Sequence, residues 1–474
     1  MEIKSVSEVQ IVDRLKFDNT WWSDGKIPRL YGQMQPRLYF DKLFKLVYHS
    51  KVRRAVIVMG PRRVGKTVMI YHQIDALIKN GVSPNCILYA SLDTPIYTGQ
   101  ALESLINLYF KTKGIDARNE KCYIFFDEIQ YLEDWEIHLK SLVDSYHNAR
   151  FIASGSAAAA LKLKSRESGA GRFTDFNLPP LTFHEYIHLR DLNDLIIQED
   201  DTWNDKLVSK FATRDIQALN NEFVKYINYG GYPEVSLDEE IVEDPYRYLK
   251  DDIISKVLQR DLPSLYGIQD IKELNRLFMT IAWNTGNEFN YEGLSQNSGA
   301  SINTIKKYVE YLETAFLIRL VYRIDDNGKR FKRQINFKIY LTNPSLRSGL
   351  FSPANDLDEK FGSLVETAIF SQWFNRPKQP LHYARWKSGE IDIVNLSRKD
   401  MKPTFAVEVK WSDRYGTNRS NLKSLLTFMG KHKLRRVLLT SKHITRVMSF
   451  EEGEIELMPA ALYCYTVGRR SLEV

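Results

Sequence analysis

An eight-residue segment near the start of the chain, GPRRVGKT at residues 60–67, constrains the fold more than any other feature. A β-branched run, RAVIVM, comes directly before it, and a helical pattern follows it until Gly81 offers a C-cap. The spacing GxxxxGK[ST] between a strand and a helix is that of a phosphate-binding loop, whose backbone N–H groups face phosphate oxygens at the positive end of the helix. A chance glycine-rich turn would not require this flanking strand and helix. The segment therefore predicts an α/β domain with a parallel sheet that binds ATP.

Each residue type in this loop has an expected chemical role. Gly60 and Gly65 let the loop curl, and Lys66 is expected to reach the β- and γ-phosphates and to take part in catalysis. The hydroxyl of Thr67 is expected to ligate Mg²⁺, so ATP and Mg²⁺ are the expected cofactors. The predicted nucleotide-binding residues of the loop are Gly60, Pro61, Arg62, Arg63, Val64, Gly65, Lys66, Thr67 and Val68.

A second apolar strand, CYIFF, ends in Asp127 and Glu128. Ligands gather at the carboxyl edge of a parallel sheet, so this placement fits a Walker B element. We expect Asp127 to hold Mg²⁺ through water and Glu128 to act as the catalytic carboxylate that orients or deprotonates the attacking water.

Small hydroxyl side chains follow a third strand, RFIAS. Ser154 or Ser156 could sense the γ-phosphate or position water, and an ordinary turn with a helix N-cap at Ser156 is an equal alternative. In the next loop, Arg166 and Arg172 either supply an arginine finger or remain solvated charges.

Length and composition bound the rest of the chain. A chain of 474 residues exceeds one core of usual size, and 43% hydrophobic with 26% charged residues is ordinary for a globular protein. Three distant cysteines suggest neither disulfides nor a zinc finger. The N-terminus has no apolar signal-like segment, and no eighteen apolar residues run together, so we expect a cytoplasmic protein without a membrane partner. A net charge of +7 permits DNA or another nucleic acid as a partner without requiring one.

The middle of the chain predicts two helical modules. Residues 189–262 are polar and helical around a GGYPEV turn, which suits a lid over the nucleotide. Arg260 in this segment either approaches a phosphate or pairs with Asp261 or Asp252.

Residues 263–345 show three helical patterns and then two β-like runs around a DNG turn, which predicts a winged helix-turn-helix. Such a module contacts nucleic acid through its third helix and its basic hairpin, although many winged helices bind protein instead. The residues offered to nucleic acid are Asn303, Thr304, Lys306, Lys307, Lys329, Arg330, Lys332 and Arg333.

The last part of the chain has a mixed α/β pattern with four candidate catalytic residues. Glu366 lies on a helix, Asp392 on a strand, and Glu408 and Lys410 two residues apart on the same face of another strand. Asp392 and Glu408 would ligate Mg²⁺ or Mn²⁺, and Lys410 would position a water or neutralise charge. The alternative is a structural copy of the fold that binds nothing.

Several segments together resemble a known family. NTWW at 19–22, GPRRVGKT, FFDEIQYLEDWE at 125–136, ASGS, GRF with PPLTFHEY, and NYGGYPEV at 228–235 are similar to bacterial and archaeal AAA-type ATPases that carry a C-terminal domain of unknown function. The likeness covers nearly the whole chain. It implies that the turn Gly231-Tyr232-Pro233 contacts the nucleotide through Pro233.

A second resemblance concerns the C-terminal residues. The order Glu, Asp, Glu-x-Lys, with Gly389 and Glu390 before Asp392, resembles the PD-(D/E)xK restriction-endonuclease-like superfamily, which includes relatives of Holliday-junction resolvases. This resemblance implies metal-dependent cleavage of nucleic acid.

The sequence thus predicts an α/β multidomain protein. Its expected parts are an N-terminal arm (1–35), an AAA-type P-loop ATPase core (36–188), a helical lid (189–262), a winged helix-turn-helix (263–345) and a restriction-endonuclease-like α/β domain (346–474). The leading hypothesis is an ATP-hydrolysing protein that acts on nucleic acid and could form a homo-oligomer. The alternatives are a nucleotide-switched regulatory protein and a DNA-binding scaffold with an inactive nuclease fold.

Overall fold

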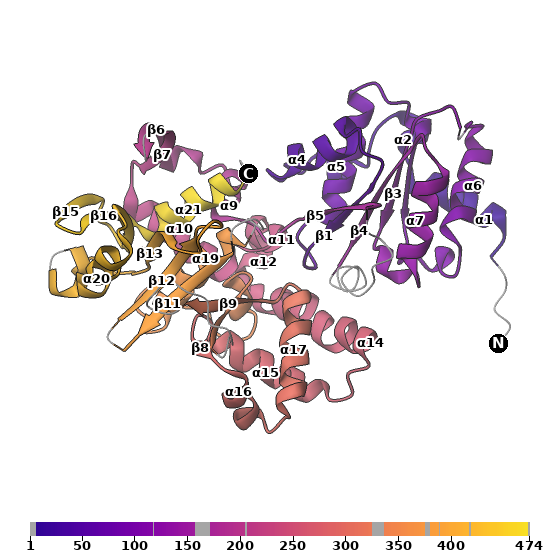
Figure 1. The fold of residues 1–474 in the computed structure, drawn as a ribbon. Helices are drawn as coiled ribbons and strands as arrows, with labels where there is room; N and C mark the ends of the chain where they lie inside the picture. The colour runs from indigo at the N-terminus through magenta and orange to yellow at the C-terminus, as the bar shows by residue number, and fades with distance from the viewer. Residues whose placement is uncertain are drawn as a thin grey trace. The chain divides into compact units, whose positions relative to one another are not determined.

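The computed structural model describes residues 6–116, 118–156, 171–203, 206–324, 336–374, 380–387, 389–416 and 419–472 (Figure 1). The chain divides into two compact units, residues 1–179 and residues 180–474. Helix α9 (Phe183–Leu189), which the sequence assigns to the P-loop core, belongs to the second of these units.

A five-stranded parallel sheet forms the centre of the first unit. Its strand order is β2-β3-β4-β1-β5, so the strand that leads into the phosphate-binding loop lies inside the sheet. The strands are β1 (Ala55–Met59), β2 (Ile87–Ser91), β3 (Cys122–Asp127), β4 (Ala149–Gly155) and β5 (Phe173–Asn177). Every residue of β1 and β3 is buried, as expected for parallel strands that are covered on both faces. The predicted parallel α/β core is therefore confirmed.

Helices flank both sides of this sheet (Figure 1). In the described part of the first unit they are α1 (Glu8–Asp18), α2 (Trp21–Asp24), α3 (Arg29–Gly32), α4 (Phe40–Phe44), α5 (Lys66–Lys79), α6 (Leu102–Lys113) and α7 (Trp135–Ser145). A short π-helical turn, η1 (Lys45–His49), continues α4.

The N-terminal arm caps the outer edge of β2. Asn19 accepts a hydrogen bond from the Tyr89 N–H at 2.7 Å and donates one to the Tyr89 carbonyl at 2.9 Å, so its amide pairs as a neighbouring strand would. The indole N–H groups of Trp21 and Trp22 both donate to the Ile87 carbonyl. An edge strand otherwise leaves backbone groups unpaired, and these side chains supply the partners.

A mixed nine-stranded sheet forms the centre of the second unit, in the order β15-β16-β14-β13-β12-β11-β9-β10-β8. The strands are β8 (Glu288–Phe289), β9 (Ile318–Ile324), β10 (Phe337–Leu341), β11 (Leu381–Trp386), β12 (Gly389–Leu396), β13 (Pro403–Glu408), β14 (Arg436–Ser441), β15 (Arg446–Phe450) and β16 (Gly453–Pro459). Strand β9 pairs in parallel with β11, with His382 opposite Tyr322. The strands expected in the winged helix and those expected in the nuclease-like domain therefore belong to one sheet.

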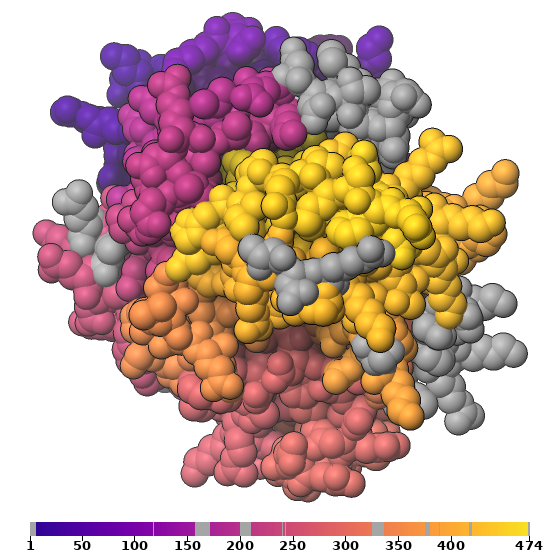
Figure 2. Space-filling view, turned by 90° about the vertical axis from the view of Figure 1, so that its left-hand side faces the viewer, coloured from indigo at the N-terminus to yellow at the C-terminus, as the bar shows by residue number. Residues whose placement is uncertain are grey.

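Both faces of this sheet are covered. Ile393 and Val394, neighbours on β12, lie in two different buried clusters. One cluster contains apolar residues of α19 (Phe361–Trp373) and α21 (Ala460–Ser471), and the other contains those of α20 (Lys423–His432). The C-terminal segment in yellow and the orange segment before it form a continuous surface of this unit (Figure 2).

The remaining helices of the second unit precede or surround the sheet. In its described part they include α10 (Ile216–Tyr229), α11 (Pro233–Leu237), α12 (Glu239–Glu243), α13 (Pro245–Arg247), η7 (Tyr248–Ser255), η8 (Val257–Asp261), α14 (Leu262–Tyr266), α15 (Ile271–Trp283), α16 (Tyr291–Ser298), α17 (Ile302–Thr314) and α18 (Ser345–Ser348).

The prediction of a wholly helical segment at 189–262 is wrong at its start. An antiparallel hairpin, β6 (Ile196–Trp203) and β7 (Lys206–Thr213), pairs from Ile196 opposite Thr213 to Trp203 opposite Lys206. The physical reason is that backbone pairing along two eight-residue strands outweighs the helix propensity of a polar sequence whose apolar residues lack a 3.6-residue period.

Candidate functional site

The phosphate-binding loop is tightly curled between β1 and α5. Arg63 and Gly65 both adopt positive φ angles, 64° and 89°. A Cβ atom at Gly60 would lie 2.1 Å from the Leu178 carbonyl oxygen, so this position requires glycine. The Lys66 ammonium donates to the carbonyl oxygens of Gly60 and Pro61 at 3.1 and 2.8 Å, which holds it against the loop that the sequence predicts it to serve.

Asp127 is the meeting point of this site. Its Oδ2 accepts a hydrogen bond from the Thr67 hydroxyl at 2.7 Å, so the two predicted Mg²⁺ ligands lie together although α5 and β3 are far apart in the sequence. Its Oδ1 accepts hydrogen bonds from the Ser154 hydroxyl and from the Glu128 N–H. Asp127 is buried, and these donors satisfy its carboxylate oxygens.

Tyr89 is a further member of this site that the sequence analysis missed. Its hydroxyl donates to Asp127 Oδ2 at 3.1 Å. Burial and then the nearby Asp127 charge raise the pKa of Tyr89, so the phenol keeps its proton and remains a donor. The sequence carried no signal for it, because its place depends on the parallel pairing of β2 with β3, which sets Ser91 opposite Asp127 with Tyr89 two residues before it.

Glu128 lies beside Asp127 in a left-handed backbone conformation with φ of 53°. Its carboxylate accepts a hydrogen bond from Gln130, and Gln130 in turn accepts one from the Ser156 N–H. Burial raises the pKa of Glu128, while the positive charge of Lys66 opposes the shift. A carboxylate with a raised pKa is a stronger base, which suits the role predicted for Glu128.

The two serines differ in their surroundings. Ser154 donates to Asp127 and so belongs to the site, whereas the Ser156 hydroxyl is buried with no partner in the described part of the chain. The N-cap alternative for Ser156 involves residues 157–170, which lie outside the described residues, as does Arg166. Arg172 forms an ion pair with Asp144 at 2.7 Å, and both side chains are 44% exposed.

The turn Gly231-Tyr232-Pro233 lies in the second unit. Tyr232 is fully buried, Pro233 begins α11, and the Gly231 carbonyl accepts the Leu181 N–H at 2.8 Å. The contact of Pro233 with nucleotide stays a prediction. Asp252, weighed as a partner of Arg260, pairs with Lys256 at 2.6 Å.

Helix α17 presents part of the predicted nucleic-acid surface. Its N-cap Ser301 accepts the Thr304 N–H at 3.1 Å, and Asn303, Lys306 and Lys307 are exposed. The wing residues Lys329, Arg330, Lys332 and Arg333 lie outside the described residues.

The four candidate catalytic residues of the C-terminal part lie at one centre in the second unit. Lys410 Nζ is 2.7 Å from Glu408 Oε1 and 3.7 Å from Asp392 Oδ2. The Val409 N–H also donates to Asp392 Oδ2, at 2.8 Å. Glu366 reaches the same centre from α19 through a lysine that it shares with Asp392.

That shared lysine, Lys338 on β10, was missed by the sequence analysis. Its ammonium lies 2.9 Å from Glu366 Oε1, 2.5 Å from Glu390 Oε1 and 3.3 Å from Asp392 Oδ1, and the residue is 4% exposed. Tyr340, two residues further on the same strand face, donates to Glu366 Oε1 at 2.5 Å. The sequence contains one signal for it: a lysine inside the apolar strand FKIYL is expected to be buried, and a buried charge needs polar or charged partners nearby.

The centre shifts the proton affinities of its members. Burial, and then the Asp392 charge, raise the pKa of Glu366 to about 7 and that of Glu408 to about 8. For Asp392, burial opposes ionisation, but the ammonium groups of Lys410 and Lys338 hold its pKa below the usual value. The surrounding carboxylates raise the pKa of Lys338 and of Lys410 against the effect of burial.

The donor set fits a magnesium-like ion with few protein ligands. Glu408 Oε2 is shielded from solvent and has no hydrogen-bond partner in the described structure, while Oε1 pairs with Lys410. Across the described ranges, no three His, Cys, Asp or Glu side chains are arranged to hold one metal ion. Mg²⁺ is often held by one or two carboxylates together with water and substrate phosphates, which the pair Asp392 and Glu408 could provide.

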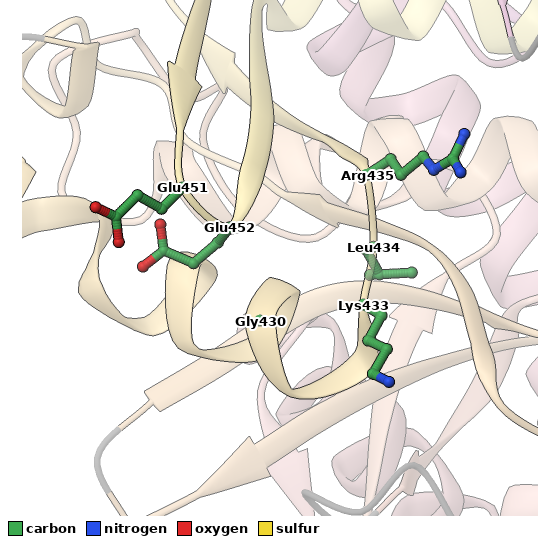
Figure 3. A pocket seen from close by; sticks show the side chains of 6 residues that line it. All are labelled: Gly430, Lys433, Leu434, Arg435, Glu451 and Glu452. Carbon is green, nitrogen blue, oxygen red and sulfur yellow. The ribbon is translucent and has the colours of Figure 1, made fainter.

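A separate pocket of about 510 Å³ lies between the end of α20 and the turn that joins β15 to β16. It is lined by Gly430, Lys433, Leu434, Arg435, Glu451 and Glu452 (Figure 3). The side chains of Lys433 and Arg435 point away from the two glutamates, and none of the predicted site residues lines this pocket.

Comparisons with known proteins support the first of these sites. Residues 52–187 match the family model of an AAA domain, and residues 220–356 match a model described as a domain of unknown function (DUF8612). An uncharacterized protein of Haemophilus influenzae is 24% identical over 409 residues, which are 84% of this chain and 90% of that protein. An uncharacterized protein of Methanocaldococcus jannaschii is 26% identical over 383 residues, which are 77% of this chain and 78% of that one.

Two solved structures of Hsp104 are also similar. A closed-state cryoEM reconstruction with ATPγS and FITC casein is 18% identical, with 34% of this chain and 31% of that chain covered and a TM-score of 0.26. An S. cerevisiae Hsp104-ADP complex is 14% identical, with 60% and 39% covered and a TM-score of 0.31. The chain thus spans less than half of the length of either structure.

In the described residues, no helix is both long and apolar enough to cross a membrane.

The matched residues 52–187 contain β1, the phosphate-binding loop, α5 and the acidic end of β3. The first unit therefore carries an AAA-type P-loop domain.

Proposed function

We propose that the first unit binds ATP with Mg²⁺ and hydrolyses it. The observation that carries this proposal is the 2.7 Å hydrogen bond between Thr67 and Asp127, because it joins two expected Mg²⁺ ligands from different elements beside the lysine of the loop. Bound Mg²⁺ would neutralise charge on the β- and γ-phosphates.

The protein groups have defined roles in this reaction. Lys66 exchanges its carbonyl partners for phosphate oxygens, and the backbone N–H groups of the loop bind the phosphates at the start of α5. Tyr89 and Ser154 orient Asp127. Glu128, whose pKa is raised by burial, positions the attacking water and accepts its proton.

Two substitutions test this assignment. Lys66→Ala should abolish ATP binding, measured with a fluorescent ATP analogue, whereas Glu128→Gln should keep binding and lose turnover. Lys79→Ala is a matched control, since Lys79 lies on the same helix but is 73% exposed and pairs with Asp75. ATP affinity that is unchanged in Lys66→Ala would refute the phosphate-loop assignment, and full turnover in Glu128→Gln would remove Glu128 as the catalytic carboxylate.

A second candidate function is metal-dependent cleavage of nucleic acid by the second unit. It is favoured by the unpartnered Glu408 Oε2 next to Asp392 and Lys410. A bound Mg²⁺ or Mn²⁺ would stabilise charge on the scissile phosphate. Asp392 and Glu408 would hold the ion, Lys410 would position the water, and the exposed residues of α17 would contact the nucleic acid backbone.

The experiment is cleavage of single-stranded, duplex and branched DNA with Mg²⁺ or Mn²⁺, with and without ATP. Cleavage by the wild type that is lost in Asp392→Ala supports the candidate. If neither protein cleaves any substrate, the regulatory or scaffold alternative is favoured, and salt-dependent DNA binding that survives in Asp392→Ala would identify a DNA-binding scaffold.

The ATP site has a separate test for a homo-oligomer. If a second copy of the chain supplies an arginine to this site, ATP turnover per molecule should rise with protein concentration.

A further inference from the structure

Three tyrosine side chains form a row that leads from the N-terminal arm to the ATP site. The ring of Tyr31, on α3, stacks on that of Tyr71, on α5, with 4.0 Å between the ring centroids and 9° between the planes. The Tyr71 ring lies 4.9 Å from that of Tyr89, whose hydroxyl donates to Asp127 Oδ2. Tyr71 and Tyr89 are buried, whereas Tyr31 is half-buried at the outer end of the row. Side-chain contacts therefore connect the arm with Asp127 without a break.

The backbone of the arm is also attached to α5 and to the phosphate-binding loop. The Tyr31 carbonyl accepts a hydrogen bond from His72 Nε2 at 2.9 Å, and His72 follows Tyr71 on α5. Further along the arm, the buried Arg37 donates to the Val64 carbonyl of the loop at 2.7 Å. The arm thus keeps a defined position beside the elements that hold the nucleotide.

The middle ring of the row lies next to a predicted Mg²⁺ ligand. Tyr71 follows Thr67 by four residues on α5, so the two side chains are neighbours on one face of the helix. Thr67 and Tyr89 both donate to Asp127 Oδ2, so the row supports the same carboxylate oxygen as Thr67 does. Burial, and then the Asp127 charge, raise the pKa of Tyr31, as expected of a phenol that lies close to that carboxylate.

We propose that Tyr31 is a positioning residue of the ATP site, which acts through Tyr71 and Tyr89 to hold Asp127 in the orientation that binds Mg²⁺. This inference rests on the binding of ATP with Mg²⁺ proposed above for the first unit. Tyr31 precedes residue 52, where the match to the AAA family model begins, so the arm adds this support from outside the matched domain. Without the outer ring, Tyr71 is free to turn, and the Tyr89 hydroxyl loses its fixed direction towards Asp127.

The gain in nucleotide affinity that Mg²⁺ provides tests the inference. A fluorescent ATP analogue that resists hydrolysis is titrated into the full chain, once with Mg²⁺ and once with EDTA. The dissociation constant in EDTA divided by that with Mg²⁺ measures what the metal ligands contribute. In Tyr31→Ala we expect this ratio to fall by about two- to tenfold, the size of one aromatic contact, while the affinity in EDTA is unchanged. Tyr31→Phe keeps the ring and should retain the wild-type ratio.

Two further variants locate the effect. Tyr89→Phe removes the hydroxyl that reaches Asp127 and should also lower the ratio. Adding Tyr31→Ala to Tyr89→Phe should lower it no further, because both changes act on one contact. Leu30→Ala is the matched control, since Leu30 precedes Tyr31 on α3, is 64% exposed and should leave the ratio unchanged.

The outcomes separate the inference from the function on which it rests. A wild-type protein that binds no analogue, or binds it equally with Mg²⁺ and with EDTA, removes the proposed ATP site together with the inference. A wild-type ratio in Tyr31→Ala or in Tyr89→Phe overturns the inference alone, as do equal losses of affinity with Mg²⁺ and with EDTA in Tyr31→Ala. If Tyr31→Ala does not fold, Tyr31→Leu, which fills more of the space without an aromatic ring, takes its place in each comparison.

Discussion

Asp127 and Lys338 are charged side chains that the fold removes from water, and their partners show why the cost is tolerated. Asp127 receives hydrogen bonds from Thr67, Tyr89 and other donors. Lys338 is surrounded by three carboxylates. A buried charge that loses its partners is costly, so such groups persist where they are fully paired. At the scale of single residues, both candidate sites are thus networks rather than isolated side chains.

We expect the stability of the second unit to fall as pH rises when divalent ions are absent. The pKa values of Glu366 and Glu408 are raised to about 7 and about 8 in the folded protein, from the usual 4.5. A carboxyl group with a raised pKa binds its proton more tightly when folded, so its contribution to stability is complete below the unfolded pKa and is lost as pH rises through the folded value. The lowered pKa of Asp392 acts with the opposite sign, but only in the acid range near its own pKa. Calorimetric melting of the full chain between about pH 5 and pH 9 should therefore show a falling Tm.

Glu408→Gln provides the control for this prediction. In the wild type, ionising Glu408 at high pH costs free energy in the folded protein, and the amide of the variant cannot titrate and avoids this cost. The Tm of the variant minus that of the wild type should therefore increase with pH, by roughly 2–4 °C for each kcal/mol of that cost. A difference that is equal at both ends of the pH range would show that the pKa of Glu408 is not raised.

Residue patterns in the sequence identified some members of each site and missed others for a physical reason. Lys66, Thr67, Asp127 and Glu128 lie within motifs whose spacing carries the chemistry. Tyr89 and Lys338 contribute through strand neighbours that are distant in sequence. Spacing along one strand predicts which residues share a face, but not which other strand lies beside it.

At the scale of single elements, the arm before β1 acts as a substitute strand. Asn19 is fully buried and pairs with both backbone groups of Tyr89, the residue that also donates to Asp127. The side chain of Asn19, the C-cap of α1, therefore fixes the position of β2 and of the Tyr89 hydroxyl. The NTWW segment, which the resemblance singled out, has this structural role.

Asn19→Ala should destabilise the first unit by about 2–4 kcal/mol, because it leaves the Tyr89 N–H and carbonyl buried without partners. Urea unfolding followed by tryptophan fluorescence measures the loss, since Trp21 and Trp22 lie next to the substitution. Asn80→Ala is the matched control, because Asn80 is exposed and its side chain donates to Ala76 of its own helix. Equal loss of stability in the two variants would contradict the edge-capping role.

Elements were predictable where local pattern and tertiary context agree. The strand, loop and helix at β1 and α5 have both an apolar run and a diagnostic loop, and the structure contains them. The hairpin β6–β7 lies in a polar segment without periodicity, so only its backbone pairing reveals it. Local propensity is a weak guide when pairing between segments decides the outcome.

At the scale of the whole molecule, the nine-stranded sheet joins segments that the sequence divides into separate modules. The sheet pairs β9 with β11, which lie on either side of the predicted boundary at 345/346. One buried cluster contains Tyr226, Tyr340 and Phe370, which the sequence assigns to three different parts of the chain. Strand order cannot be predicted from periodicity, because periodicity carries no information about which edges meet.

Expression of parts of the chain tests whether the second unit folds as one body. Residues 180–474 should show a single cooperative thermal transition, because they keep the whole sheet and both buried clusters. Residues 346–474 alone should be molten or insoluble, because they lose β8, β9 and β10, leave the edge of β11 unpaired, and remove Lys338 from Glu366 and Asp392. Far-UV circular dichroism during melting and the dispersion of amide NMR signals distinguish the two states. A cooperative transition and dispersed signals from residues 346–474 would instead establish the C-terminal part as a self-contained domain, and Lys338 would then be an addition to a carboxylate centre that assembles without it.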